Sequence, residues 1–359
     1  MKPSVLFISG REVDYIRNRV VLNALRTHFD VIMRTASAHT TMARTIAGLA
    51  RFITHTPEYD VCFVGFYGQL LAVALSVLQR KPIVLDAYVS TYDTLCEDRR
   101  RFSPRSPIGH LARWLDRRSC QVATRVITDT EAHARYFKET FGIPEHKLTT
   151  IYVGCDEKLF HPHGQVSAEP QRFEVFYYGS FLPLHGTEVI VQAAALLSDR
   201  ADIHFTLGGD GVRRVAVERM ISDMALCNID LVGWIPLERL PAYIARASVC
   251  LGGHFSTVPK AGRVISTKTF QFVAMRKPTI VADNPATREL FVPGEHVYVT
   301  PVGDPAALAE AIRVLAGDDV LRHRIASGGY EVFKQRLTTR AIADQLAILI
   351  EEARCVSAS

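Results

Sequence analysis

The sequence predicts an α/β protein with two Rossmann-like domains, each built on a parallel β-sheet. Short β-rich runs alternate with helix-forming stretches along nearly the whole chain, the order found in parallel sheets that are covered by helices on both faces. The 359 residues exceed the size of one ordinary hydrophobic core. The alternation lapses over residues 158–172 and then begins again, which predicts a boundary between two domains of common size.

The first half of the chain contains six runs typical of strands, separated by helical patterns. Strands are predicted at residues 5–8, 29–33, 61–64, 82–86, 125–128 and 148–152, and helices at 15–28, 42–54, 69–78, 108–122 and 128–142. Thr128 and Glu131 form a capping-box pattern that should begin the last of these helices. Pro162, Gly164 and Pro170 make residues 158–172 the predicted linker.

The second half repeats the pattern, and most of its strands end in glycine. Strands are predicted at residues 173–178, 203–207, 229–232, 249–251 and 279–282, and the first four stop at Gly179, Gly208, Gly233 and Gly252. A last amphipathic helix is predicted at 338–353. We therefore expect a first domain over residues 1–165, a second over 173–335, and a terminal segment, 336–359, whose helix packs at the domain junction.

The composition limits the classes of function. Hydrophobic residues make up 48% and charged residues 22% of the chain, which is typical of a globular protein. No apolar run reaches transmembrane length and the N-terminus lacks the features of a signal peptide, which predicts a cytoplasmic protein. The seven cysteines show no short paired spacing, which argues against a disulfide framework or a zinc site. A Gly-x4-Gly-Lys-Ser/Thr loop for nucleotide hydrolysis is not present.

The excess positive charge lies in the first half. Residues 1–172 hold 23 Lys and Arg against 17 Asp and Glu, whereas the whole chain holds 42 against 37. This distribution suits an anionic partner near the first half, including the inner face of a membrane. The predicted helix at 108–122 combines an apolar stripe with Trp114 and several arginines. It would either lie on an anionic membrane or pack its stripe on the sheet, and both interpretations fit the sequence.

The least ordinary chemistry lies in residues 252–277, where two glycines that end a strand are followed by a basic loop and a helix start. Lys260, Arg263 and Lys268 occur there, with no acidic residue before Asp283. Cations beside the free N–H groups of a helix start would bind a phosphate. A solvated basic surface also fits these residues alone. Because ligands of open α/β sheets lie beyond the carboxyl ends of the strands, the four glycine-ended strands favour a nucleotide.

Several segments resemble the family 4 glycosyltransferases, which have the two-domain GT-B fold. LTTIYVGCDEKLFHP at residues 148–162 is similar to the domain-junction signature of the family, and FYYGSFLPLHGTEVIVQAA at 176–194 to the start of its donor domain. LGGDGV at 207–212 and LVGWIPLERLPAYIARASVCL at 231–251 resemble the next strand ends, and KTFQFVAMRKPTIVADNPATREL at 268–290 resembles the sugar-binding helix. The resemblance covers nearly the whole chain and is more specific in the second half.

The resemblance implies transfer of a hexose-type sugar from a nucleotide diphosphate sugar to an acceptor, usually with retention and without a bound metal or other cofactor. The first domain would bind the acceptor, such as a lipid-linked saccharide or a polysaccharide precursor, and the second domain the donor. Nucleic acid is not an expected partner. From the resemblance and the basic loop together, the donor-binding candidates are Gly179, Ser180, His185, Gly209, Asp210, Gly233, Trp234, Ile235, Lys260, Arg263, Lys268 and Gln271.

Two positions depart from the pattern of the family, whose members commonly carry a glutamate, seven residues and a second glutamate where this chain has Arg263 and Gln271. Gln271 can still form hydrogen bonds with a ribose, whereas Arg263 cannot replace a carboxylate on the donor hydroxyls. The loop from Ser180 to His185 also lacks the cations that often clamp the diphosphate. We hypothesise that Lys260, Arg263 or Lys268 supplies this charge and stabilises the departing nucleotide diphosphate, which makes Lys260 and Arg263 catalytic candidates.

The acceptor-side candidates follow the strands of the first half. Asp86 ends the fourth strand and is the catalytic candidate for binding or deprotonating the acceptor, although a carboxylate there also suits a turn. The other acceptor-binding candidates are Arg17, Tyr88, Tyr92 and Asp93. Two further functions fit the architecture: a nucleotide-sugar epimerase or phosphorylase, and a non-catalytic subunit that binds a nucleotide sugar.

Overall fold

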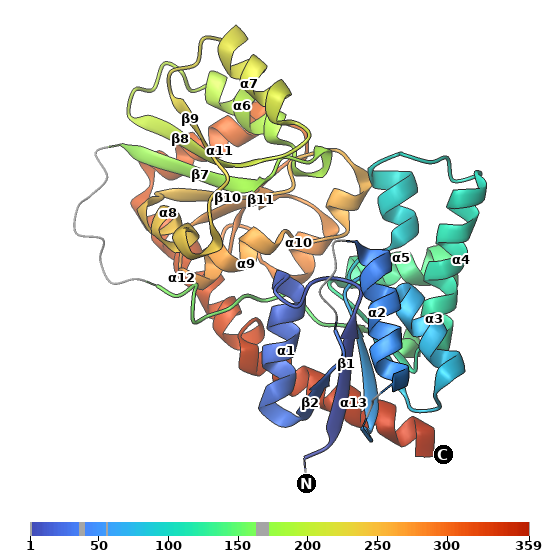
Figure 1. Ribbon diagram of the computed structural model, residues 1–359. Helices are drawn as coiled ribbons and strands as arrows, with labels where there is room; N and C mark the ends of the chain where they lie inside the picture. Colours follow the sequence, from blue (N-terminus) through green and yellow to red (C-terminus); the bar gives the residue numbers. More distant parts are fainter. Residues whose placement is uncertain (1, 36–39, 55–56, 163–171, 359) are drawn as a thin grey trace. The chain divides into compact units, whose positions relative to one another are not determined.

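The computed structural model describes residues 2–35, 40–54, 57–162 and 172–358. The chain divides into two compact units, Met1–Val153 with Thr339–Ser359, and Gly154–Thr338, and their elements are labelled in Figure 1. Residues 163–171 of the predicted linker lie outside the described part. Each unit contains one six-stranded sheet in which all strand pairs are parallel. The predicted α/β architecture with two Rossmann-like sheets is confirmed.

The sheet of the first unit has the order β2-β1-β3-β4-β5-β6. Its strands are β1 (Ser4–Ser9), β2 (Asp30–Met33), β3 (Val61–Gly65), β4 (Ile83–Asp86), β5 (Arg125–Thr128) and β6 (Leu148–Thr150). Its helices are α1 (Ile16–His28), α2 (Thr41–Thr54), α3 (Gln69–Leu78), α4 (Pro107–Val122), α5 (Glu131–Phe141) and α13 (Thr339–Ala358), with the π-helix η1 (Asp93–Asp98) and the short 3-10 helix η2 (Glu145–Lys147).

Two hydrophobic layers cover the two faces of this sheet, because successive strand residues point to opposite faces. Phe7 and Phe63 pack with α1 and α13, whose Leu25 and Leu346 are buried in the same cluster. On the other face, Leu6 and its neighbours pack with α3, α4 and α5. The last helix, α13, thus completes the first unit by packing along α1 (Figure 1).

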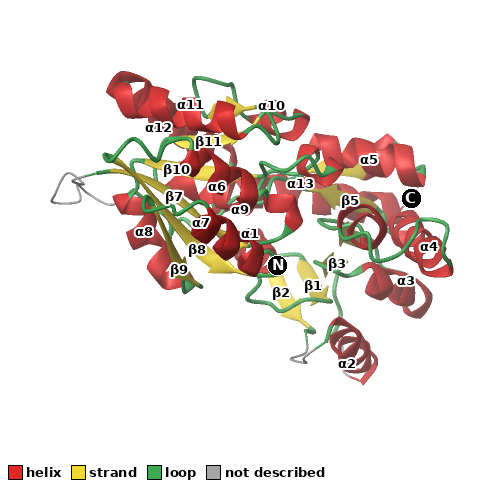
Figure 2. Cartoon of the chain, turned by 90° about the horizontal axis from the view of Figure 1, so that it is seen from above, coloured by secondary structure: helices red, strands yellow, loops and turns green. Residues whose placement is uncertain are grey.

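The sheet of the second unit has the order β12-β11-β10-β7-β8-β9. Its strands are β7 (Phe173–Ser180), β8 (Ile203–Asp210), β9 (Ile229–Gly233), β10 (Val249–Gly253), β11 (Thr279–Ala282) and β12 (Tyr298–Thr300). The helices are α6 (Thr187–Ala195), α7 (Arg214–Asp223), α8 (Leu240–Arg246), α9 (Thr267–Ala274), α10 (Pro285–Leu290), α11 (Pro305–Gly317) and α12 (Asp319–Arg336), with the short turns η3 (Pro183–His185), η4 (Leu237–Arg239) and η5 (Pro259–Gly262). Figure 1 shows the strands of this unit between two groups of helices, and in Figure 2, seen from above, α6 and α7 lie in front of the strands.

One local prediction is wrong, and one of the two interpretations of α4 holds only in part. The N-cap of α5 is Thr130, whose hydroxyl accepts a hydrogen bond from the His133 N–H, because β5 continues as far as Thr128. In α4 the buried face includes Ala112, Asp116 and Cys120, whereas part of the predicted apolar stripe is exposed. Leu111 is 61% exposed and Trp114 is 53% exposed. The stripe of α4 therefore does not pack on the sheet as a whole.

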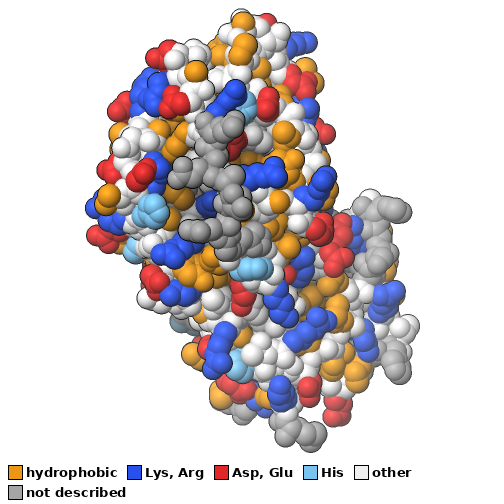
Figure 3. Space-filling model, turned by 90° about the vertical axis from the view of Figure 1, so that its left-hand side faces the viewer, with side chains coloured by type: hydrophobic (Ala, Val, Ile, Leu, Met, Phe, Trp, Pro, Cys, Tyr) orange, Lys and Arg blue, Asp and Glu red, His pale blue; other side chains and the backbone are white. Residues whose placement is uncertain are grey.

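A helix must be both long and apolar to span a bilayer. Within the described residues, none of them is both long and apolar enough to span a membrane. On the face drawn in Figure 3, Lys and Arg side chains are interspersed with Asp and Glu.

Candidate functional site

The glycine-ended strands of the second unit lie next to one another at one edge of its sheet. Gly179 at the end of β7 is the register partner of Gly209 in β8, and Gly208 is the partner of Gly233 in β9. The end of β10, Gly252 and Gly253, lies on the other side of β7. The carboxyl ends of four strands therefore form one continuous edge, as their sequence pattern indicates.

The backbones approach closely at this edge, and glycine is required there. Gly209 has φ +140°, and a Cβ atom at this position would lie 1.9 Å from the carbonyl oxygen of Gly179. A Cβ atom on Gly179 would lie 3.0 Å from the hydroxyl of Tyr177 and 3.2 Å from Nδ1 of His185. Any side chain here would displace strand ends or fill the space in front of His185.

A basic cluster lies beside these glycines. We define it as His185 at the end of η3, His254 directly after β10, and Lys268 in the first turn of α9. The imidazole rings of His185 and His254 are stacked with centroids 5.5 Å apart. Nζ of Lys268 lies 5.1 Å from the centre of the Tyr177 ring and donates a hydrogen bond to Ser266 Oγ at 2.9 Å. Three segments that are distant in sequence thus bring basic side chains together.

The basic cluster is buried, and several of its polar atoms lack hydrogen bonds. Lys268 is 5% exposed and His254 is 6% exposed. Among the described residues, Nδ1 of His185, Nδ1 of His254 and the Tyr177 hydroxyl have no hydrogen-bond partner. Buried polar atoms are nearly always hydrogen-bonded in folded proteins. Three such atoms in one place indicate a site whose partner is a ligand.

Burial changes the proton affinities in the cluster. It lowers the pKa of Lys268 from 10.5 to about 7. Burial, together with the nearby Lys268 and Lys260, lowers the pKa of His254 to about 3. Burial also lowers the pKa of His185 well below its usual 6.5, and the nearby Lys268 and His254 lower it further. These shifts have the direction expected where positive charge is held without a counter-ion.

The predicted cations of the basic loop lie at the same edge of the sheet. Lys260 is buried in η5, and the partly buried Arg263 ends that turn. The turns η3 and η5 are in contact, which places the segment of these two cations beside that of His185. Arg263 is therefore on the same side of its unit as the glycines.

The remaining donor-side candidates have different environments. Gln271 is buried, and its Oε1 accepts a hydrogen bond from the Tyr178 hydroxyl. Its amide N–H groups are therefore the groups that would donate to a ribose. Ile235 is buried against Gly208, whereas Trp234 is 70% exposed. Ser180 and Asp210 are exposed register partners, and Asp210 Oδ1 accepts from the Gly211 N–H. These residues line the edge but do not join the basic cluster.

In the first unit, Arg17 and Asp86 form a buried, bidentate ion pair. Nε and Nη2 of Arg17 donate to the two carboxylate oxygens at 2.8 and 3.0 Å, and Nη1 donates to the carbonyls of Ile151 and Tyr152. Burial alone would lower the pKa of Arg17, but the Asp86 carboxylate outweighs it and raises the pKa. The expectation of an accessible carboxylate at Asp86 and an acceptor-facing Arg17 is corrected, because the two side chains satisfy each other inside the unit.

The other acceptor-side candidates lie on the loop that follows β4. Tyr92 packs in the hydrophobic cluster with its ring edge-on to Phe141, and Asp93 is also buried; a role of either residue in acceptor binding stays a prediction. Tyr88 is partly exposed and lies 5.8 Å from the Arg17 guanidinium. Of the four acceptor-binding candidates, Tyr88 alone keeps an accessible side chain in the described unit.

A buried carboxylate that the sequence analysis missed holds this loop. Asp116 of α4 accepts hydrogen bonds from the Ser90 hydroxyl and from the N–H groups of Thr91 and Tyr92. Burial raises its pKa to about 6, against the opposing effect of these bonds. Asp116 occupies a position of α4 that faces the core. A search for the periodicity of apolar residues does not detect a carboxylate at such a position.

A second buried pair was also missed. Nδ1 of His133 lies 2.6 Å from Oδ1 of Asp129, four residues before it, and both side chains are buried. Groups of three or more His, Cys, Asp or Glu side chains that could hold a metal ion do not occur in the described ranges.

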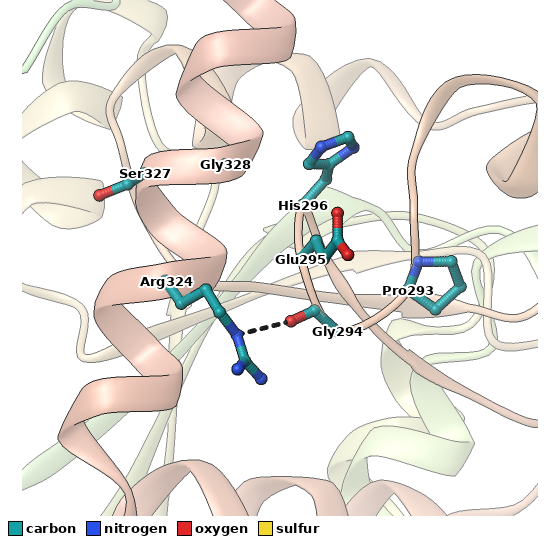
Figure 4. Close-up of a pocket in the computed structure, with 7 residues that line it drawn as sticks. All are labelled: Pro293, Gly294, Glu295, His296, Arg324, Ser327 and Gly328. Carbon is teal, nitrogen blue, oxygen red and sulfur yellow. Dashed lines mark hydrogen bonds between the residues drawn. The ribbon is translucent and has the colours of Figure 1, made fainter.

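A shallow hollow lies elsewhere on the second unit, between the loop before β12 and helix α12 (Figure 4). In it Nε of Arg324 donates to the carbonyl of Gly294 at 3.1 Å. The loop leads into the amino end of β12, and because all strands of this sheet are parallel, the hollow lies at the edge opposite the glycines. It is therefore separate from the basic cluster.

Comparison with known families matches each half of the chain to glycosyltransferases. Residues 6–159 match the model described as Glycosyltransferase Family 4, and residues 172–318 match that described as Glycosyl transferases group 1. The alpha-D-kanosaminyltransferase of Streptomyces kanamyceticus is 24% identical over 303 residues, which are 80% of this chain and 74% of that protein. The lipopolysaccharide core biosynthesis glycosyltransferase LpsD of Rhizobium meliloti (strain 1021) is 24% identical over 48% of this chain and 47% of its own length.

Solved structures resemble the whole chain. Sucrose-phosphate synthase from Thermosynechococcus elongatus superposes with a TM-score of 0.78 at 17% identity, and the match covers all of both chains. HepE of Anabaena in complex with UDP superposes with a TM-score of 0.74 at 18% identity, over 98% of this chain and 100% of that one. At such identities the likeness shows the fold.

Proposed function

The chain belongs to the glycosyltransferases of the GT-B fold, and from this premise we propose that it moves a hexose-type sugar from a nucleotide diphosphate sugar to an acceptor. Similar structures that contain UDP and UDP-glucose support such a donor. Relatives named as lipopolysaccharide core glycosyltransferases support a saccharide acceptor. Retention of the anomeric configuration is the outcome that the resemblance implies, and NMR of the product's anomeric carbon tests it.

The observation that carries the proposal is the buried basic cluster at the glycine-rich sheet edge. A diphosphate brings the oxygen acceptors that Lys268, His185 and His254 lack. As the bond to the sugar breaks, negative charge grows on the departing nucleotide diphosphate, and fixed cations at this place stabilise that charge more than they stabilise the donor. Lys260 and Arg263 on the adjoining turn add to the same field.

Nucleotide release from a panel of UDP, ADP and GDP sugars, with and without an extract of glycan acceptors, tests the function. Acceptor-dependent release supports transfer. Isomerised sugar without release would instead indicate an epimerase, and binding without either reaction a non-catalytic subunit.

Arg263 is the proposed catalytic cation. Arg263→Ala should lower turnover by well over tenfold, because the arginine lies in the segment beside the cluster and its charge would act on the leaving group. Arg219→Ala on the exposed face of α7 is the control for loss of one positive charge, and it should keep full turnover. Equal activity of the two variants would remove Arg263 from the role.

We also propose that transfer needs no bound metal, since lysine and arginine side chains supply the positive charge at the diphosphate and the histidines donate hydrogen bonds. Turnover should then be unchanged after treatment with EDTA. Loss of turnover that added Mg²⁺ or Mn²⁺ restores would contradict this part of the proposal.

A peripheral contact of the first unit with the inner face of a membrane completes the proposal for a cytoplasmic enzyme with a lipid-linked acceptor. On α4, Ile108, Leu111 and Trp114 are exposed together with Arg113 and Arg117, a combination that suits an anionic interface. The chain has two tryptophans, so a Trp234→Phe variant makes Trp114 the only tryptophan, which can be excited selectively over tyrosine. Its emission should shift to the blue with vesicles containing phosphatidylglycerol, and Leu111→Glu should abolish the shift. No shift in either case would exclude this contact.

A further inference from the structure

The basic cluster contains hydrogen-bond donors but no acidic partner. Lys268 contacts Ser266 and the Tyr177 ring, and the orphan atoms around it are two imidazole nitrogens and the Tyr177 hydroxyl. All of these atoms can donate to an oxyanion in a suitable tautomer. Gly253 carries no side chain beside Nζ, and a Cβ atom there would lie 3.7 Å from it. The cluster thus surrounds a place suited to a phosphoryl group.

The groups that face Lys268 from the neighbouring elements do not neutralise it. Tyr177 comes from β7, His185 from η3, His254 from the end of β10, and Lys260 from η5. On α6, Glu188 forms an ion pair with Arg213 at 3.4 Å. On α9 itself, Gln271 is uncharged. A protonated Lys268 is therefore held among like charges and neutral groups.

We propose that this pocket takes up one proton together with the diphosphate of a nucleotide sugar, and that Lys268 receives the proton. The inference rests on the proposed function, since it needs a diphosphate donor. In the empty site the ammonium is buried and its contacts are Ser266 and the Tyr177 ring, not a carboxylate, so the neutral amine is favoured. A phosphate oxygen within hydrogen-bond reach of Nζ reverses this preference. Donor binding and protonation then occur as one event.

The lowered proton affinity of the unliganded lysine fixes the size of the effect. With the pKa of Lys268 at about 7, about nine-tenths of the sites are neutral at pH 8 and about one-tenth at pH 6. Binding should therefore take up about 0.9 proton at pH 8 and about 0.1 at pH 6. The donor affinity should fall by about tenfold for each pH unit above 7, until the pKa of the bound state is reached.

Isothermal titration calorimetry with UDP-glucose measures the uptake directly. At one pH, the apparent enthalpy in HEPES, Tricine and Tris varies with the ionisation enthalpy of the buffer, and the slope is the number of protons taken up. The diphosphate diester of UDP-glucose does not titrate over this range, so the protons bind to the protein. ADP-glucose and GDP-glucose replace UDP-glucose if it does not bind. Binding of none of the three would overturn the proposed function along with the inference, whereas binding without uptake at pH 8 overturns the inference alone.

Two variants that replace a lysine with arginine identify the residue that receives the proton. Lys268→Arg keeps a positive charge that cannot be lost, so it should bind UDP-glucose with no uptake and with an affinity that no longer falls above pH 7. Lys277→Arg lies just beyond the other end of α9, where that lysine donates to the carbonyls of Ala245 and Ala247, and it should keep the full uptake. Uptake that persists in Lys268→Arg would assign the proton to another group and overturn the inference.

A measurement on the unaltered protein covers the case in which Lys268→Arg does not fold. The chain contains nine lysines, so the ¹³Cε resonances of labelled lysine form a simple spectrum. One of them should titrate near pH 7 in the free protein, and saturating UDP-glucose should move its midpoint upward by about two units or more. Nine resonances that all titrate near the usual lysine pKa in the free protein would overturn the inference.

Discussion

Replacing Lys268 with methionine should make the unliganded second unit more stable at pH 6.5, although it removes a residue of the donor site. Methionine has a similar length and no charge, so it fills the same space without desolvating an ammonium. The pKa of Lys268 is lowered from 10.5 to about 7 by burial. Between these values the unfolded chain binds more protons than the native one, so the stability of the native protein rises with pH over this window.

The size of the effect follows from the shift of about 3.5 units, at about 1.4 kcal/mol per unit. The burial penalty is then about 5 kcal/mol at pH 6.5 and about 2 kcal/mol at pH 9. Methionine loses the hydrogen bond to Ser266 and the contact with the Tyr177 ring. At pH 6.5 these offset about 2 kcal/mol together, whereas at pH 9 the native amine is neutral and only the hydrogen bond, about 1 kcal/mol, is lost. The net stabilisation should be about 3 kcal/mol at pH 6.5 and about 1 kcal/mol at pH 9, and at pH 6.5 it corresponds to a rise in Tm of roughly 6–12 °C for a unit of this size.

Differential scanning calorimetry of the transition of the second unit, at both pH values, measures this difference. Lys277→Met is the matched control, because that lysine is partly buried but donates to two carbonyl groups. Its removal leaves those acceptors unsatisfied and should destabilise the unit at both pH values. If Lys268→Met instead destabilises the unit at pH 6.5, or stabilises it equally at both pH values, the account of an uncompensated buried lysine is wrong.

Three further substitutions probe the packing around the two units. Arg17→Met leaves the buried Asp86 carboxylate without its partner and should destabilise the first unit by about 3–5 kcal/mol in urea unfolding; a cost below 1 kcal/mol would show that water reaches the pair. Asp116→Ala removes the acceptor of three donors and should cost about 2–4 kcal/mol, with faster amide exchange in the loop after β4 as its local sign. Gly209→Ala would place its Cβ atom 1.9 Å from the Gly179 carbonyl and should weaken UDP binding at least tenfold, an expectation that unchanged affinity in calorimetry would refute.

The sheets and their glycine-rich edge were predictable because both depend on local patterns. Each strand is a short apolar run, and its end is marked by a residue that permits a turn. The environment of α4 was not predictable in this way. Asp116 lies on the buried face of that helix because its carboxylate binds the loop after β4, and a search for apolar periodicity assigns such a position to the surface.

The composition of the site was predictable only in part. Lys260 and Lys268 stood out because they follow a strand that ends in two glycines. His254 and the Tyr177 hydroxyl were missed. They come together because β10 pairs with β7 in the sheet, although β8 and β9 lie between these strands in the sequence. Asp86 was misread for a related reason. Its partner Arg17 lies 69 residues earlier, and a sequence does not reveal that two distant charges neutralise each other.

The contrast between Arg17 and Lys268 separates structural from functional buried charge. Both side chains are buried below the carboxyl ends of parallel strands, but every donor that Arg17 directs inward meets a carboxylate or carbonyl oxygen. Lys268 has one hydroxyl and one aromatic ring, and the polar atoms nearest to it also lack partners. An arrangement that costs several kcal/mol in the empty protein is stable only because the rest of the unit compensates for it. This cost is recovered when an anion binds. We therefore expect the donor to bind at the basic cluster and not at the equally buried ion pair.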